Sequence, residues 1–166
     1  MVVYSSEKWW KVGDYVSIES KLPYFIGEHS HNIDKKGRII IPAKFREYLS
    51  EIIYVTRGLD GCLKIYTDEQ FKKLAAQIYQ MPSTKKEARE YQRFFLSSAA
   101  DCEIDGQGRI LIPANLIKSA CLIKECVVIG CGNTIEIWSK ERWDAYNELH
   151  NDDIEEVAES LTEFLI

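Results

Sequence analysis

A twelve-residue motif occurs twice in this chain, and this repetition limits the possible folds more than any other feature of the sequence. HNIDKKGRIIIP occupies residues 31–42, and CEIDGQGRILIP occupies residues 102–113, seventy-one positions later. The Asp, the Gly, the Arg and the Pro stand in register in both copies. One chain of 166 residues therefore contains two copies of one structural unit.

The size of each copy indicates that the two copies depend on each other. A unit of roughly 70 residues buries little apolar surface relative to the chain entropy that it loses on folding. We therefore expect fusion, strand exchange or oligomerisation to complete the core.

The repeat continues beyond the motif and predicts the same order of elements in both halves. After a one-residue shift, YVTRGLDGCLKIYTDEQF at 54–71 aligns with CVVIGCGNTIEIWSKERW at 126–143. The runs IIIP and ILIP are too short and too β-branched for helices, and Pro42 and Pro113 are expected to occupy the first helical position after them. Each half is predicted to form strand, turn, strand, short helix, strand, turn, strand and helix.

Two sequence patterns predict where the longer helices begin. Thr67 followed by Gln70, and Thr84 followed by Glu87, both fit the capping box, in which two side chains satisfy free backbone N–H groups. The second pattern predicts a helix that connects the two halves.

The residue types in the motif predict a tight turn between two strands. Gly37 and Gly108 can adopt the positive φ that such a turn requires, while Asp34 and Asp105 can accept hydrogen bonds from backbone donors.

The distribution of charge is uneven and favours a polyanionic partner for one region. The net charge is -5, but residues 141–166 contain nine acids and one base. Residues 29–46 carry a net charge of +4, from five basic residues against a single acid. Because the local field attracts a polyanion more than the total charge repels it, nucleic acid stays a candidate partner.

The spacing of Asp and Arg in DKKGR and DGQGR places the two side chains together across each turn. A carboxylate there can hold the guanidinium of Arg38 or Arg109 by charge-assisted hydrogen bonds. One interpretation is that the pair only stabilises the turn. Another is that the arginine is held ready to contact guanine in the major groove, since its planar fork matches the guanine acceptors.

The neighbouring residues distinguish the two turns. Lys35 and Lys36 in the first turn are expected to contact phosphates, which increases affinity without sequence selectivity. The second turn has Gly106 and Gln107 at those positions. We therefore expect the first turn to dominate contact with DNA.

The motifs resemble those of a known family. FIGEHSHNIDKKGRIIIPAKFREYL, VTRGLDGCLKIY, AADCEIDGQGRILIPANL and VVIGCGNTIEIWSKERW are similar to MraZ, a family of bacterial transcriptional regulators with two SpoVT-AbrB type domains. The resemblance implies an α+β fold of two tandem swapped-hairpin β-barrel units with short helices. It also implies a pseudo-twofold arrangement and assembly of subunits into a ring, commonly an octamer.

The same resemblance implies a function and a set of DNA-contacting residues. Members bind short direct repeats of double-stranded DNA in the promoter of their own division and cell-wall gene cluster, usually as repressors. A cytoplasmic, nucleoid-associated protein without a cofactor is expected. The DNA-contacting residues implied for this chain are Asp34, Lys35, Lys36, Gly37, Arg38, Asp105, Gly108 and Arg109.

The sequence suggests five segments. They are an N-terminal extension (1–23), a first repeat (24–80), a connecting helix (81–98), a second repeat (99–145) and an acidic C-terminal helix or tail (146–166).

Two other classes of function stay open. A catalytic group could be assembled on paper from His29, His31, Asp34, Asp60 and Cys62. No catalytic motif accompanies these residues, and the protein is not expected to be an enzyme. An interaction module of antitoxin type could use the acidic tail to wrap a basic partner.

The cysteines and the hydropathy pattern add further expectations. The five cysteines have mostly apolar neighbours and no CxxC spacing, so they are expected to be reduced core residues. The even spacing of Cys121, Cys126 and Cys131 lacks an accompanying His, and no metal site is expected. No apolar run reaches the length of a membrane span, and no membrane partner is expected.

Overall fold

The computed structural model describes residues 24–164, and the elements follow the order predicted from the repeat. The first half contains β1 (Phe25–Asn32), β2 (Arg38–Ile40), α2 (Ala43–Arg46), β3 (Ile52–Arg57), a 3-10 turn (Leu59–Gly61), β4 (Leu63–Tyr66) and α3 (Asp68–Tyr79). Helix α4 (Lys86–Leu96) follows. The second half contains β5 (Ala100–Glu103), β6 (Arg109–Leu111), α5 (Ala114–Ser119), β7 (Glu125–Gly132), β8 (Ile135–Ser139) and α6 (Lys140–His150), and α7 (Ile154–Ser160) comes last.

Both halves contribute three strands to an antiparallel six-stranded sheet with the order β1-β7-β8-β4-β3-β5. β1 of the first half pairs with β7 of the second half, and β5 of the second half pairs with β3 of the first half. β4 and β8 join the halves at the centre. Exchanging equivalent strands of the two halves leaves the order unchanged, so the sheet is symmetric with respect to the repeat.

The buried side chains of both halves form one core. Ile39 and Ile110 are each 1% exposed, and they belong to the same cluster as Val55 and Val128. A second cluster lies beneath α6 and contains Cys62, Val127, Ile129 and Trp138, with Trp143 and Tyr146 packed against it. Because the main core draws on both halves, neither half encloses an apolar interior by itself.

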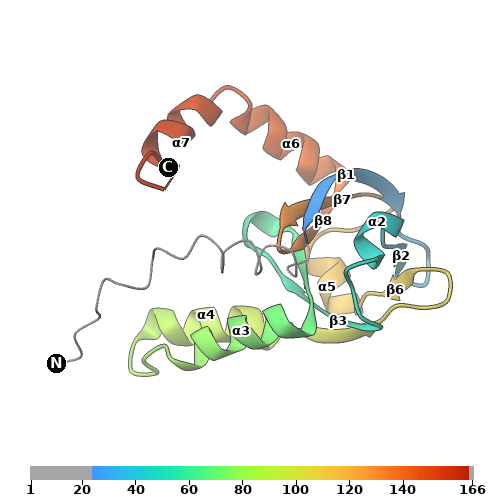
Figure 1. Cartoon of the computed structure of the whole chain (residues 1–166), viewed down its shortest axis with the longest axis horizontal. Helices are drawn as coiled ribbons and strands as arrows, with labels where there is room; N and C mark the ends of the chain where they lie inside the picture. The colour runs from blue at the N-terminus through green and yellow to red at the C-terminus, as the bar shows by residue number, and fades with distance from the viewer. Residues whose placement is uncertain (1–23, 165–166) are drawn as a thin grey trace, which may run out of the picture.

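The longer helices lie outside the sheet on different sides (Figure 1). α3 and α4 lie side by side and pack on β3, where the Thr56 hydroxyl donates to the Phe95 carbonyl at 2.7 Å. α6 and α7 extend from the other side, and α7 has no buried residue. Arg142 of α6 connects the halves, because its Nη1 donates to the carbonyls of Gly61 and Ser119.

The helix starts agree with the sequence prediction at one position and differ at others. The capping box of Thr67 and Gln70 forms at the start of α3. The box predicted from Thr84 and Glu87 is wrong, because Lys85 is the N-cap of α4 and no side chain caps that end. The preceding turn, in which the Lys85 N–H donates to the Pro82 carbonyl, delays the helix by one residue.

The prolines also differ from the prediction by one position. Pro42 and Pro113 are the N-caps of α2 and α5, with φ of -50° and -57°, rather than the first helical residues. Their ψ values of 137° and 144° are extended, so each proline is the last extended residue before the helix begins.

Three of the cysteines are core residues as expected, and two are not. Cys62, Cys102 and Cys126 are buried, whereas Cys121 and Cys131 are exposed. Cys121 follows the end of α5 with a φ of +54°, where the chain turns at the surface.

The described part of the chain has no helix that is long and apolar enough to cross a membrane. The predicted extension at residues 1–23 lies outside the described residues.

The motif glycines occupy backbone conformations that other residues rarely adopt. Gly37 has a φ of +83° and Gly108 a φ of +76°. A Cβ on Gly37 would also lie 2.8 Å from Ile117 Cδ1 and 3.2 Å from the Ile112 carbonyl oxygen. Since Ile112 and Ile117 belong to the other half, each turn fits closely against the opposite repeat.

We expect Gly37→Ala to destabilise the protein by about 1–3 kcal/mol, because the new Cβ meets both an unfavourable φ and two neighbouring atoms. Urea unfolding measures the change. Gly106→Ala is the matched control, since it lies in the second turn, has no atom within 4 Å of its Cβ and should change stability by less than about 1 kcal/mol. Equal effects of the two substitutions would contradict the proposed role of Gly37.

Candidate nucleic-acid interface

The two copies of the motif meet in a two-stranded antiparallel ribbon made of β2 and β6. Arg38 pairs with Leu111, Ile39 with Ile110, and Ile40 with Arg109. The Ile41 N–H donates to the Gly108 carbonyl and the Ile112 N–H donates to the Gly37 carbonyl, each at 2.9 Å. The turns of the two motifs therefore lie at opposite ends of one ribbon, although they are seventy-one residues apart in the chain.

In the first turn, the Asp34 carboxylate holds both the backbone and the arginine. Its Oδ1 accepts hydrogen bonds from the N–H groups of Lys36 and Arg38, both at 2.9 Å. Its Oδ2 accepts from Arg38 Nε at 2.7 Å. One carboxylate thus fixes the turn and the first part of the guanidinium at the same time.

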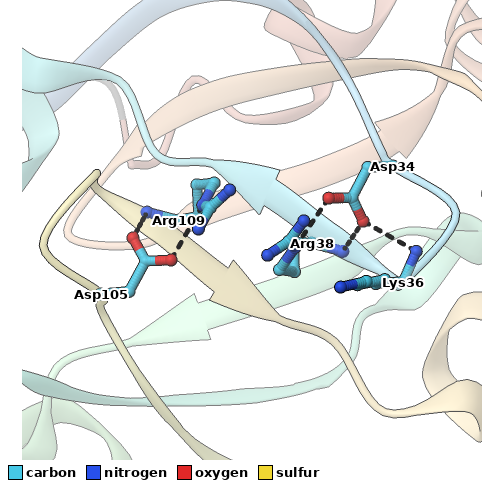
Figure 2. Close-up of polar contacts among 5 residues, drawn as sticks. All are labelled: Asp34, Lys36, Arg38, Asp105 and Arg109. Atoms are coloured by element: carbon cyan, nitrogen blue, oxygen red, sulfur yellow. Dashed lines mark hydrogen bonds and ion pairs between the residues drawn. The ribbon is translucent and has the colours of Figure 1, made fainter.

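The second turn repeats this geometry. Asp105 Oδ1 accepts from the N–H groups of Gln107 and Arg109 at 2.9 Å, and Oδ2 accepts from Arg109 Nε at 2.8 Å. Figure 2 shows the two Asp–Arg pairs, each with its aspartate on the loop before the strand and its arginine on the strand, and the arginines lie between the two aspartates in this view. Because the same contacts form twice, the Asp–Arg spacing in the sequence encodes this geometry.

The hydrogen bonds keep both carboxyl groups ionised. The backbone N–H of Arg38 is the main cause that lowers the pKa of Asp34, and the Arg38 side chain and the Lys36 N–H act in the same direction against partial desolvation. The pKa of Asp105 is lowered in the same way by the Arg109 N–H, the Arg109 side chain and the Gln107 N–H. The anchoring carboxylates are therefore charged at neutral pH.

The arginines are anchored at one end and accessible at the other. The side chains of Arg38 and Arg109 are 31% and 25% exposed, and only Nε of each bonds to its aspartate. Within residues 24–164, their terminal Nη atoms have no ion-pair or hydrogen-bond partner. Each guanidinium can therefore donate to an external ligand without losing its anchor.

The charge around the two turns is supplied differently. Lys35 and Lys36 are exposed in the first turn. In the second turn, the guanidinium of Arg46 from α2 lies against Gly108, so close that a Cβ there would be 2.5 Å from Arg46 Cζ. The first half therefore provides a basic group to the turn of the second half.

The structure places the eight residues that the sequence singled out as DNA-contacting candidates at the two ends of the ribbon, five in the first turn and three in the second. Arg46 was counted only as part of the basic segment, and the sequence did not place it at the second turn. The aligned repeat contains a partial signal for this contact. The residue of the second half that aligns with Arg46 is Ile117, and Ile117 lies against Gly37, the glycine of the first turn. Each turn is thus covered by the short helix of the other half.

The residues considered for catalysis do not resemble a nucleophilic centre. Burial raises the pKa of the Cys62 thiol to about 12, so the thiol is protonated at neutral pH. The ring of His29 packs against Phe45 at a centroid distance of 5.2 Å. Asp34 is engaged by the first turn through the contacts described above.

The fold and the paired turns define a class of protein in which two tandem repeats complete one antiparallel structure. Comparison of the sequence with known proteins identifies the family. The model of the family described as "MraZ protein, putative antitoxin-like" matches twice, at residues 24–94 and 95–165. The chain therefore belongs to the MraZ family.

Similar curated proteins carry the same name. "Transcriptional regulator MraZ" of Heliobacterium modesticaldum is 51% identical over 140 residues, which cover 84% of this chain and 98% of that protein. The proteins of that name from Ligilactobacillus salivarius and a Thermoanaerobacter strain are 49% and 50% identical. The alignments cover 84% and 85% of this chain, and 98% and 99% of those relatives. The family is one of regulators and not a class of enzymes.

We expect Asp34→Asn to release the Arg38 guanidinium while keeping much of the turn, because an amide oxygen can still accept from backbone N–H groups. Nitrogen relaxation of the Arg38 Nε–H group by NMR should show increased motion. In the unmodified protein this signal should stay unchanged from about pH 8 to pH 5, since a lowered carboxyl pKa keeps the ion pair until more acidic pH. Equal Arg38 mobility in the variant and the unmodified protein would contradict the anchoring role, and Asp105→Asn is the control that should affect Arg109 alone.

Proposed function

We propose that this protein is a sequence-specific DNA-binding transcriptional regulator and that the β2–β6 ribbon contacts the major groove. The observation that carries the proposal is the pair of anchored, outward-accessible arginines at the two ends of one ribbon. A two-stranded ribbon fits the width of the major groove, and arginine makes the commonest specific contact with guanine there. The regulator name shared by the relatives supports the same function.

Each residue of the turns has a distinct role in this proposal. Arg38 and Arg109 donate to the O6 and N7 acceptors of guanine. Lys35 and Lys36 bind phosphates near the first end, and Arg46 does so near the second end. The remaining four residues position the arginines rather than contact bases: Asp34 and Asp105 anchor them, and Gly37 and Gly108 shape the turns.

Anchoring increases the benefit of each contact. A free arginine side chain loses roughly 2 kcal/mol of rotamer freedom when it is fixed. Asp34 and Asp105 already restrict Nε in the unbound protein, so less entropy remains to be lost on binding.

The position of the acidic segment reconciles the net charge of -5 with a polyanionic ligand. α6 and α7 contain most of the nine acidic residues of the segment 141–166, and both helices extend away from the β2–β6 ribbon (Figure 1). The field at the turns is therefore dominated by Arg38, Arg109 and their basic neighbours rather than by the acidic helices.

The target and the assembly follow from family membership in this proposal. The protein binds direct repeats in the promoter of its own division and cell-wall gene cluster, acts there as a repressor, and resides in the cytoplasm with the nucleoid. Two swapped-hairpin barrel units at residues 24–80 and 99–145 form one pseudo-twofold subunit, and the subunits form an octameric ring. The exchange of β1 and β5 between the halves supports the swapped arrangement.

We expect Arg38→Ala to weaken binding to the specific operator by about 5- to 150-fold, because one bidentate contact contributes roughly 1–3 kcal/mol of discrimination. The operator is first recovered by selecting bound fragments from random DNA. Gel shifts then compare the operator with scrambled DNA, and thermal unfolding confirms that the variant is folded. Unchanged preference for the operator in the folded variant would contradict the assignment of Arg38.

Lys36→Ala should instead weaken binding to all sequences by a similar factor, because phosphates are the same in every sequence. Its signature is a smaller dependence of affinity on salt, with the slope of log affinity against log salt falling by about 0.9 for each lost phosphate contact. Fluorescence anisotropy at several salt concentrations measures this slope. Lys73→Ala in α3 is a control that should leave the slope unchanged, and a loss of specificity in Lys36→Ala would contradict a phosphate role.

One feature favours a second function, a protein-interaction module of antitoxin type. α7 is acidic and leaves Ile154 and Val157 exposed, with Leu161 and Phe164 continuing the apolar residues beyond it. Deleting residues 151–166 distinguishes the two functions. If the protein is a regulator, the deletion should keep operator affinity within about twofold, because surface changes away from an interface have small effects. If it is an antitoxin, the deletion should abolish binding to the partner protein and leave DNA binding unchanged.

A further inference from the structure

The ribbon exposes two apolar side chains between its arginines. Ile40 is 42% exposed and Leu111 is 58% exposed. On the opposite face, Ile39 and Ile110 are each 1% exposed and belong to the core. The ribbon therefore has apolar side chains on both faces, and the core uses only those of one face.

The register places all four outward residues in one compact arrangement. Leu111 lies directly opposite Arg38, and Ile40 lies directly opposite Arg109. Residues that are opposite each other, and residues two apart on one strand, point to the same face of an antiparallel pair. Two aliphatic side chains and two arginines thus form alternate corners of the outer face, with opposite Cβ atoms roughly 4.5–5.5 Å apart.

The charge on this face indicates what covers it. Contact between the same face of two copies would bring Arg38 and Arg109 of one copy against those of the other, and like charges would repel. Lys35 and Lys36 border the same ribbon at the first turn, which adds positive charge. The face therefore matches a polyanion that also offers apolar groups.

We propose that Ile40 and Leu111 read thymine methyl groups in the major groove, next to the guanines read by Arg109 and Arg38. The inference rests on the proposed function and extends it to a further pair of specificity-determining residues. The thymine 5-methyl is the apolar group on the major-groove edges of the bases, and aliphatic side chains contact it there.

The geometry restricts where these thymines lie. Cross-strand neighbours on the ribbon are about 5 Å apart, and successive bases rise by about 3.4 Å. The thymine read by Leu111 is therefore expected within one or two base steps of the guanine read by Arg38. The same spacing applies to Ile40 and the guanine read by Arg109.

The test replaces each thymine of the selected operator with deoxyuridine, one position at a time. This change removes only the methyl group and keeps the hydrogen-bonding pattern of the base. Loss of one buried methyl should weaken binding by about fourfold. We expect this effect at one or two thymines near the guanines, and no effect at other thymines.

Two variants assign the effect to the side chains. Ile40→Ala should remove the sensitivity at one thymine, and Leu111→Ala should remove it at another, so that each variant binds thymine and deoxyuridine operators equally at its own position. Ile52→Ala is the matched control, because Ile52 is 50% exposed on β3 of the six-stranded sheet and should keep the full deoxyuridine effect. Thermal unfolding and the particle mass in solution are measured for all three variants.

Several outcomes would overturn the inference. They are equal binding of thymine and deoxyuridine operators by the unmodified protein, a selected operator without thymine beside the guanines, and a deoxyuridine effect that persists in both variants. A changed particle mass in Ile40→Ala or Leu111→Ala would assign the face to contact between copies instead. Recovery of no specific operator would overturn the proposed function itself, whereas an operator that depends on Arg38 but not on thymine methyls would overturn only this inference.

Discussion

The pairing of β2 with β6 is the constraint on which the rest of the structure depends. Each strand has only three residues and comes from a different copy of the motif, and the ladder hydrogen bonds of each strand are made with the other half. The same pairing directs Ile39 and Ile110 into the shared core and places the two turns at opposite ends of one ribbon. A chain with a single copy would lack both the interior and the arrangement of the two arginines.

The Asp–Arg pair stabilises the turn and anchors the arginine with one set of atoms. Oδ1 of the aspartate closes the turn through two backbone N–H groups, and Oδ2 restrains the arginine that follows. The two interpretations that the sequence left open, a turn stabiliser and a base-reading group, are therefore compatible in this geometry. The arrangement requires a positive φ at one position of each turn, and glycine adopts this φ in both copies without steric strain.

Much of this could be predicted from the sequence because the determinants are local. The turn of residues 34–38, the capping box of Thr67 and the order of elements depend on neighbours within a few positions, and all three form as predicted. The predicted start of α4 was wrong because the turn at Pro82 competes with the capping box predicted at Thr84. The position of Arg46 against Gly108 could not be derived from the sequence, because it depends on which strands pair across the halves. An alternating apolar pattern indicates the buried face of a strand but not the strand that it pairs with. The exposure of Cys121 depends equally on tertiary position, since its apolar neighbours look the same in a core or at a surface turn.

The two ends of the ribbon are related by the repeat but are not identical. Arg38 is bordered by two lysines. Arg109 is bordered by Gly106 and Gln107 of its own turn and by the guanidinium of Arg46, which belongs to α2 of the other half. A true homodimer would present the same surface at both ends and would suit a palindrome, in which the two half-sites point in opposite directions. The two repeats of this chain differ at these positions, so in the proposed function the ribbon has a front and a back. Such a surface has an orientation along a duplex, and copies of it can follow one another in the same direction.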